Sequence, residues 1–400
     1  MRRLLFIPFN LLSHVGRCTT LAKSLGNELE IVFLVSPNYA KFVENHGFTY
    51  HLNSNDEEDL LKRIKQFDFS WIDEENIKLN FSRLIKNLEK IKPDIVVSDS
   101  NIFASLACEY LNIPHISLVN TYMTRYYNER HTDLSYLNFA LKVFLKILFK
   151  LIPEEKRNYI LSTGENIFLK KFHSPFNIVR KELKLTTKDH LFEEYEGETV
   201  FLLDPKEIFP IEENHKVKII GPVYYDLNVQ DNDNLPTFSD SKPNIAITLG
   251  SSGDLKKFLF IEKLNLSEKF NVILLGDLAC RLNIDQAQKF RYVNISKISN
   301  AIDVVICHGG NGTVYSFLRS GVPSIMIPSH IEQYWFSYQI QKFGLGEIYR
   351  NDKSIIDILE KWIAVRRSGL LTEMSDLFDV NKSITKFKSY LSEFIKNKFN

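Results

Sequence analysis

The sequence has few cysteines and lacks the spacing of a metal site. Its 400 residues include four cysteines, far apart at Cys18, Cys108, Cys280 and Cys307. Neither zinc-ligand spacing nor the density of a disulfide scaffold is present. We interpret all four as reduced thiols and expect neither a bound metal nor a cofactor.

Charge and hydrophobic runs exclude further classes of protein. The formal net charge is +1 at pH 7, which gives no electrostatic reason to expect a nucleic-acid partner. No apolar stretch approaches the roughly 18 to 20 residues of a membrane span. Pro8 and Asn10 interrupt the amino-terminal apolar run short of a signal-peptide core, and no small-residue cleavage site follows. The sequence therefore predicts a cytoplasmic protein.

Short runs rich in Ile, Val, Leu and Phe recur in both halves of the chain. They occupy residues 3–9, 31–35, 94–99, 115–119, 244–250, 271–276, 303–307 and 322–328. Such runs are typical of strands buried on both faces of a parallel sheet, and helix-like segments lie between them. The pattern predicts an α/β fold with two doubly wound parallel sheets, one in each half.

The same pattern predicts the domain boundaries. A chain of this length favours two domains. We expect an amino-terminal domain over residues 1–220 and a second domain over residues 243–375. Between them, residues 221–242 are polar, acidic and rich in proline, which is typical of an exposed linker. Residues 376–400 have an amphipathic helical pattern that would allow this segment to pack back on the first domain.

The segment "HGGNGT" follows a predicted strand and leads into a helix predicted to begin near Thr313. It consists of His308, Gly309, Gly310, Asn311, Gly312 and Thr313. Glycines let the backbone turn tightly and approach a ligand, and a helix amino terminus attracts phosphate. The spacing is neither that of a P-loop nor that of a dinucleotide fold. A tight turn alone would explain the glycines, but not the polar residues that accompany them.

This stretch resembles the nucleotide-sugar signature of GT-B glycosyltransferases of the bacterial UDP-glycosyltransferase-like class, family GT1. The family pattern is His-Gly-Gly, Gly-Thr, Gly-Val-Pro, a proline and an acid-glutamine pair. The chain supplies His308 to Gly310, Gly312-Thr313, Gly321 to Pro323, Pro328 and Glu332-Gln333. The resemblance implies two Rossmann-like domains facing across a cleft, the first binding an acceptor and the second a nucleotide sugar.

The resemblance also implies roles for these residues. His308 and Thr313 would bind the diphosphate of the donor, and Glu332 with Gln333 would hold sugar hydroxyls. A carboxylate and an amide at the start of a helix can discriminate between sugars, because a wrong epimer leaves buried polar groups unpaired.

A second loop, "TLGSSG" over residues 248–253, looks like the family's other phosphate-facing segment. Ser251 is the preferred contact there and Ser252 the second choice. Members that prefer UDP often carry a tryptophan upstream of the His-Gly motif, where this chain offers Tyr292. Both UDP and TDP sugars are therefore open.

A base for the acceptor is expected in the first domain. His14 follows the first predicted strand, where the family commonly has Gly-His-x-x-Pro, but Ser13 and Arg17 replace the Gly and the Pro. Imidazole titrates near neutrality, and a carboxylate partner would orient it. Asp99 ends a predicted parallel strand, at the sheet edge where ligands bind. We predict a His14–Asp99 dyad. The alternatives are that His14 caps a helix or is exposed, and that Asp99 caps a helix starting near Asn101.

Together these features predict an inverting, metal-independent glycosyltransferase. It would move a sugar from a nucleotide sugar, the co-substrate, to a hydroxyl of an apolar small molecule or lipid.

Residues 136–151 leave two alternatives open. They are almost entirely apolar, with Lys142, Lys146 and Lys150 on one helical face. The helix could cap an acceptor pocket, or it could lie at a membrane surface. The second case would favour a MurG-like transferase that acts on a lipid-linked acceptor at the inner membrane face. A catalytically silent sugar-nucleotide-binding partner of another transferase is the third hypothesis, because Ser13 and Arg17 depart from the family pattern.

Overall fold

The computed structural model describes residues 1–53, 63, 68–127, 152–212, 214–225, 235–351 and 353–399. The chain divides into two compact units, Met1–Ile220 with Lys382–Asn400, and Gly221–Asn381. The predicted helix at 136–151 lies outside the described residues, as do residues 226–234 of the predicted linker. Within the described ranges, no helix combines the length and the apolar character needed to cross a membrane.

The first unit contains a parallel sheet of seven strands in the order β3-β2-β1-β4-β5-β6-β7. The strands are β1 (Arg2–Pro8), β2 (Leu29–Val35), β3 (Thr49–Leu52), β4 (Ile95–Asp99), β5 (His115–Val119), β6 (Thr199–Leu202) and β7 (Val217–Ile219). Successive strands add outward from β1 to β3 on one side and from β4 to β7 on the other. The strand order therefore reverses between β1 and β4, and ligands of such sheets bind at the carboxyl ends of the strands at this point.

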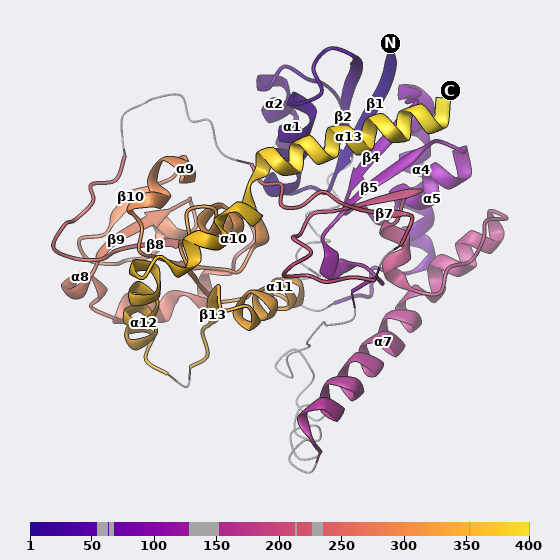
Figure 1. Ribbon diagram of the computed structural model, residues 1–400. Coiled ribbons are helices and arrows are strands. Elements are labelled where there is room, and N and C mark those ends of the chain that lie inside the picture. Colours follow the sequence, from indigo (N-terminus) through magenta and orange to yellow (C-terminus); the bar gives the residue numbers. More distant parts are fainter. Residues whose placement is uncertain are drawn as a thin grey trace. The chain divides into compact units, whose positions relative to one another are not determined.

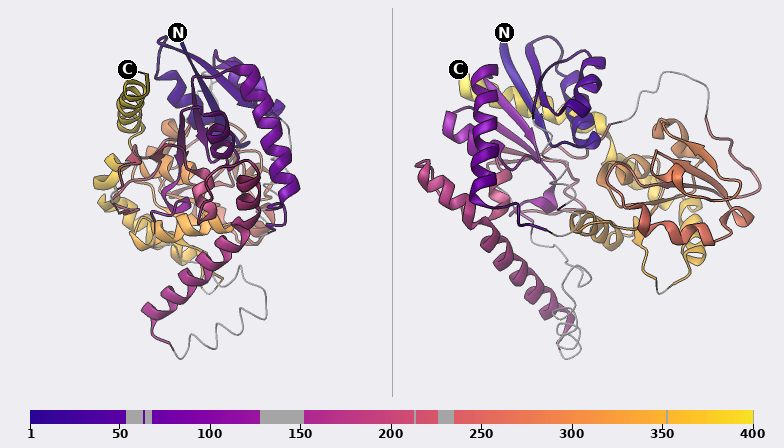
Figure 2. Two further views of the ribbon diagram at one scale, coloured as in Figure 1. Left: turned by 90° about the vertical axis from the view of Figure 1, so that its right-hand side faces the viewer. Right: turned by 180° about the vertical axis from the view of Figure 1, so that it is seen from behind.

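Helices cover both faces of this sheet. They are α1 (Leu12–Lys23), α2 (Pro37–Asn45), α4 (Glu74–Ile91), α5 (Ala104–Leu111) and α7 (Glu154–Glu182), with short 3₁₀ helices η1 (Thr121–Met123) and η3 (Leu191–Tyr195). Helix α1 contacts α2, whereas α4 contacts α5 and α7. Figure 1 shows α1 and α2 on one side of β1 and β4, with α4 and α5 on the other, and the view from behind in Figure 2 agrees. This is the doubly wound arrangement predicted from the sequence.

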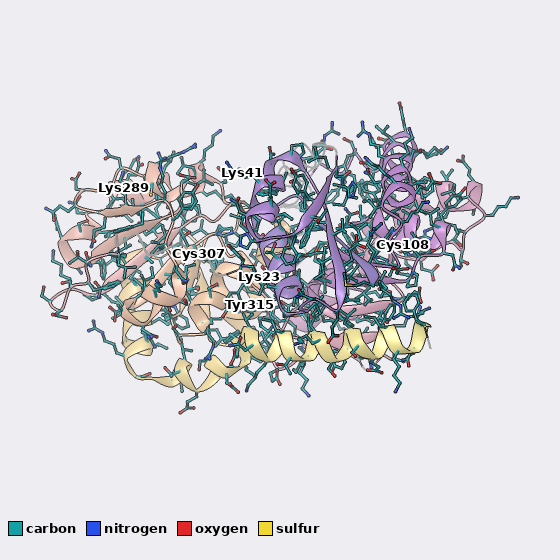
Figure 3. The ribbon with its side chains drawn as sticks, turned by 90° about the horizontal axis from the view of Figure 1, so that it is seen from above. Lys23, Lys41, Cys108, Lys289, Cys307 and Tyr315 are labelled. Carbon is teal, nitrogen blue, oxygen red and sulfur yellow. The ribbon has the colours of Figure 1, made fainter. Side chains whose placement is uncertain are left out.

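The carboxyl-terminal helix α13 (Val380–Phe399) belongs to the first unit. Figure 3 shows it as a long yellow helix beside the strands of that unit. It buries Phe387, Leu391 and Phe394, and the Phe387 ring lies 5.8 Å from that of Phe201 on β6, edge to face. The guanidinium of Arg2 stacks 4.5 Å over the Phe399 ring. The chain therefore passes between the two units twice, at 220–221 and at 381–382.

A buried ion cluster fixes α7 to the rest of the first unit. Arg180, fully buried on α7, donates from Nε and Nη2 to the two oxygens of Glu194 at 2.8 and 2.6 Å. His173 Nε2 lies 2.7 Å from the same carboxylate. Burial raises the pKa of Glu194, but hydrogen bonds from His173 and Arg180 outweigh burial and bring the pKa to about 2. The charges of this cluster pair with one another, which is typical of a structural role.

The second unit repeats the architecture with six parallel strands in the order β10-β9-β8-β11-β12-β13. These are β8 (Asn244–Thr248), β9 (Asn271–Leu275), β10 (Gln288–Phe290), β11 (Val304–Cys307), β12 (Ser324–Met326) and β13 (Gly346–Ile348). The α-helices are α8 (Leu266–Lys269), α9 (Ile295–Ile298), α10 (Asn311–Leu318), α11 (Ile331–Lys342) and α12 (Ile355–Arg367). The 3₁₀ helices are η4 (Leu255–Lys257), η5 (Leu259–Lys263), η6 (Ala279–Arg281), η7 (Ser299–Ala301) and η8 (Leu370–Phe378). Here the order reverses between β8 and β11.

Candidate functional site

In the first unit, the loops after β1 and β4 bring the two predicted catalytic residues together. Pro8 pairs with Asp99 in the sheet, and Phe9 N donates to the backbone oxygen of Asp99 at 2.9 Å. Ser100 adopts a left-handed conformation with φ of 52°, so the chain turns sharply after Asp99. Both side chains therefore lie at the reversal point of the sheet, where such folds bind ligands.

His14 Nδ1 lies 2.9 Å from Asp99 Oδ1. His14 is the third residue of α1, its side chain is 13% exposed, and Phe9 packs against the ring with the centroids 5.6 Å apart. Neither capping alternative holds, because Leu11 precedes α1 as its N-cap and α5 begins only at Ala104. The sequence therefore predicted this contact correctly, whereas the helix near Asn101 starts later than expected.

Arg17 is the residue of this site that the sequence interpretation missed. It lies one turn after His14 on α1, where residues i and i+3 share a face. Its Nε donates to Asp99 Oδ2 at 2.5 Å and its Nη2 to Asp99 Oδ1, which makes a bidentate ion pair. Nη2 also lies 2.9 Å from His14 Nδ1, and Nη1 donates to Asn120 Oδ1 at 3.2 Å. In the sequence, Arg17 stood out only as a departure from the family pattern, and nothing local to it indicated Asp99 as its partner.

The charges of this cluster are buried and tightly coupled. Asp99 is fully buried and Arg17 is 3% exposed. Burial raises the pKa of Asp99, but the charges of Arg17 and His14 outweigh it and hold the pKa well below its usual range. Burial by itself would lower the pKa of Arg17, but the charge of Asp99 outweighs burial, so the Arg17 pKa is raised. Burial and the Asp99 charge also raise the pKa of the neighbouring Cys18 thiol, so this cysteine is an inert thiol.

The polar cluster continues along the same sheet edge to β5 and β6. Asn120, directly after β5, donates from Nδ2 to the Asp204 carboxylate at 3.2 Å. The backbone nitrogen of Thr121 donates to the other Asp204 oxygen at 2.5 Å. Asn120 and Asp204 are buried. A continuous set of hydrogen bonds therefore runs from His14 through Arg17 and Asn120 to Asp204.

In the second unit, the loops after β8, β11 and β12 meet at the corresponding edge. Cys307, the last residue of β11, pairs with Thr248 of β8 and with Met326 of β12. Asp254 N donates to Ser329 Oγ at 2.9 Å, and Lys257 Nζ donates to Pro328 O at 2.6 Å. These bonds join the loop after β8 to the loop before α11.

His308 lies buried between two glycines. A Cβ on Gly250 or on Gly310 would overlap the imidazole ring, whereas one on Gly253 would first overlap the backbone oxygen of Leu249. Gly309 has φ of 75°, and a Cβ there would overlap Ser337 Oγ on α11. The glycines of this motif therefore leave room for His308 and for the packing of α11. The close approach of the backbone to a ligand, which the sequence predicted, is therefore not the only reason for glycine at these positions.

The remaining residues predicted to bind the donor take different positions. Gln333 is buried, its Oε1 accepts from Ser329 N at 2.8 Å, and its Nε2 donates to Ser252 Oγ at 3.0 Å. Ser252 is therefore tied to Gln333, whereas the preferred Ser251 is exposed. Thr313 and Glu332 are half-buried in the first turns of α10 and α11.

The helix after the motif begins earlier than predicted. Helix α10 starts at Asn311, with Gly310 as its N-cap, and Asn311 Oδ1 accepts from Gly312 N at 2.6 Å. Figure 3 labels Cys307 and Tyr315, which flank this turn. Gly309 to Thr313 therefore surround the amino terminus of α10, an arrangement that favours anions.

Comparisons with known proteins identify the class of enzyme. Residues 265–386 match the model of the glycosyltransferase family 28 C-terminal domain. A PGL/p-HBAD biosynthesis glycosyltransferase of Mycobacterium tuberculosis is 24% identical over 368 residues, which cover 88% of this chain and 82% of that protein. The crystal structure of CalG4, the calicheamicin glycosyltransferase, has a TM-score of 0.68 at 16% identity, and all of both chains is covered. The chain is a glycosyltransferase of the GT-B fold.

A second solved structure shows the same fold. The glycosyltransferase SsfS6 of Streptomyces sp. SF2575, complexed with thymidine diphosphate, has a TM-score of 0.58 at 17% identity over 98% of this chain and 100% of that one. The matched family 28 domain spans the His308 motif and the Ser329–Gln333 contact. The His14 and Asp99 contact lies in the other unit of the glycosyltransferase.

Proposed function

We propose that this glycosyltransferase inverts the anomeric carbon of a nucleoside diphosphate sugar, with His14 as general base and Asp99 as its partner. The observation that carries the proposal is the contact between His14 Nδ1 and Asp99 Oδ1 at 2.9 Å, at the reversal point of the first sheet. The acceptor would be a hydroxyl on an apolar small molecule or lipid. The proposed reaction uses no metal.

The proposed step is a single displacement. With its Nδ1 proton donated to Asp99, His14 has the Nε2 lone pair left to take the proton of the acceptor hydroxyl. The acceptor oxygen then forms a bond to the anomeric carbon, while the bond from that carbon to the diphosphate oxygen breaks. The nucleoside diphosphate leaves with the electron pair, and its charge is stabilised by His308 and the amino terminus of α10. Asp99 stabilises the resulting imidazolium.

The donor would be a UDP or TDP sugar held by the second unit. The SsfS6 structure contains thymidine diphosphate, which supports a nucleoside diphosphate as the common ligand. The proposed contacts to the diphosphate are Ser251, Ser252, Thr313, His308 and the backbone from Gly309 to Gly312. Glu332 and Gln333 are the proposed contacts to the sugar. Because Gln333 already bonds Ser252, we propose that it acts on the sugar through its remaining Nε2 hydrogen.

A transfer assay tests the proposed reaction. The purified protein would be incubated with UDP and TDP sugars and a library of hydroxyl-bearing apolar acceptors, and released nucleoside diphosphate would be measured. The expected product has the anomeric configuration opposite to that of the donor, as read from its proton NMR coupling constants. A product with retained configuration would contradict the direct displacement.

A glycine of the motif gives a prediction with a control elsewhere in the chain. Gly310→Ala would displace His308, because the added methyl overlaps the ring, so we expect the thermal shift with UDP or TDP to fall by at least half. Gly164→Ala is the control. A Cβ there meets no atom within 4 Å, and alanine favours the helix α7 in which it lies. Equal losses of the thermal shift in both variants would refute this role of Gly310.

The sequence left two alternative functions open, a catalytically silent partner and a MurG-like transferase. The hypothesis of a catalytically silent partner loses its basis, since Arg17 contacts Asp99 directly and the relatives are named as glycosyltransferases. The MurG-like alternative depends on Lys142, Lys146 and Lys150, which lie outside the described residues, as does any membrane contact through 136–151. Co-sedimentation with anionic liposomes, lost when these three lysines are neutralised, would favour a lipid-linked acceptor.

A further inference from the structure

We propose that Arg17 is a positioning residue of the glycosyltransferase that limits the protonation of His14. The inference rests on the proposed function, since it takes His14 as the base. Three facts lead to it: Arg17 shares a helix face with His14, binds both oxygens of Asp99, and places Nη2 2.9 Å from His14 Nδ1.

The bidentate pair changes the role of Asp99. In an ordinary histidine–carboxylate dyad, the carboxylate charge is compensated only when the imidazole becomes protonated. Here Asp99 Oδ1 accepts from both His14 and Arg17, and Oδ2 accepts from Arg17 Nε. Arg17 is charged at every working pH. The carboxylate is therefore already paired when the imidazole is neutral, and it favours the imidazolium less strongly.

The second effect acts directly on the ring. A guanidinium nitrogen next to Nδ1 repels a proton that would make the imidazole positive. In the tautomer that can act as the base, Nδ1 carries the proton and donates it to Asp99, so the Arg17 nitrogen lies beside that proton without a hydrogen bond to the ring. Only the tautomer with its proton on Nδ1, donated to Asp99, leaves Nε2 free to act as the base. In this arrangement Asp99 orients the ring, and the Arg17 charge opposes a second proton on it.

The titratable groups that act on Asp99 and Arg17 come from three elements among the described residues. Asp99 comes from β4, Arg17 and Cys18 from α1, and Tyr122 from η1 acts on Arg17. Phe9 covers one side of the ring and carries no charge. Asp204 is coupled to the site through Asn120, which also accepts from Arg17 Nη1. Removal of the Arg17 charge would therefore leave Asp99 as the dominant influence on His14.

The test is the pH dependence of kcat/KM for transfer, measured as nucleoside diphosphate release with a UDP or TDP sugar and the best acceptor from the library. Arg17→Met removes the charge and keeps most of the side-chain volume. Because Asp99 then acts unopposed on His14, we expect the acid limb of the profile to move to higher pH by about one unit or more. Arg17→Lys keeps a positive charge, so its acid limb should move by less than half as much.

Several controls separate this proposal from a structural role. If Arg17→Met does not fold, as judged by circular dichroism, Arg17→Gln is the neutral variant that decides, since its amide can still donate to Asp99. A neutral variant with lowered activity at every pH and an unmoved acid limb would overturn the proposal and leave Arg17 a merely structural residue. Failure of the proposed function looks different, because His14→Ala would then retain wild-type transfer.

Discussion

Replacement of His14 by alanine should lower kcat/KM for glycosyl transfer about 10²- to 10⁴-fold, the usual contribution of a general base. The variant loses the group that takes the acceptor proton, whereas the loops around His308 belong to the other unit. We therefore expect its thermal shift with the donor nucleotide to equal that of the wild type. The assay is nucleoside diphosphate release at saturating donor, with acceptor varied.

Two controls make this prediction specific. His215→Ala changes an exposed histidine of the same unit and should leave the rate unchanged. The His14→Ala substitution should also have little effect on folding, because Asp99 remains paired with Arg17 when the imidazole is removed. A rate for His14→Ala within threefold of the wild type would show that another group activates the acceptor.

Replacement of Asp99 by asparagine should destabilise the protein by about 3 to 5 kcal/mol, the usual cost of breaking a buried ion pair from one side. The change leaves the Arg17 guanidinium buried without its counter-charge. The free energy of unfolding would be measured in urea at pH 7 for the variant and the wild type. Activity should also fall, but this loss alone would not identify a catalytic role, because folding and orientation of His14 change together.

The matched control for this variant is Asp94→Asn. Asp94 is exposed near the start of β4 and accepts a bond from Arg3 N at 2.6 Å, which an asparagine oxygen can also accept. We expect its effect to lie within about 0.5 kcal/mol. A cost below 1 kcal/mol for Asp99→Asn would mean that Arg17 finds other partners and that the pair contributes little.

The pKa of Asp99 sets the pH range of this contribution. Its pKa lies below that of an unfolded aspartate, near 3.9, so the unfolded chain binds the proton more readily. The stabilisation is therefore fully present at neutral pH and is lost only as the pH falls below about 4. At pH 7 the stability difference between wild type and Asp99→Asn should be at its full size, and it should shrink in acid.

The sequence predicted the long apolar strands of both sheets because their burial on both faces leaves a continuous pattern. β5 has the predicted bounds, and β1, β4 and β11 differ by one residue at one or both ends. Of the strands that were missed, β6 is a buried apolar run that the same reasoning could have found, whereas the others carry a weaker pattern. β3 and β10 contain polar and half-buried residues at the sheet edges, and β13 has three residues. Pairing with neighbouring strands determines their structure, and single-sequence periodicity does not contain that information.

The site shows the same division between local and non-local information. The His308 motif is contiguous, so its residues could be named from the sequence. The ion pair of Arg17 with Asp99 joins residues 82 positions apart, and the substitution at position 17 appeared only as a departure from the family pattern. Likewise, nothing local indicates that Gln333 binds Ser252, because that contact forms only when the loops after β8 and β12 meet.

The most direct test of nucleotide-sugar binding is a thermal-shift screen with UDP, TDP, GDP and CDP and their sugar conjugates. A ligand that binds the folded protein raises its melting temperature by mass action. The wild type should be stabilised by UDP or TDP, or by a sugar conjugate of one of them, and His308→Ala should lose that stabilisation. No shift with any of these ligands, or an equal shift in His308→Ala, would contradict a donor site at the amino terminus of α10.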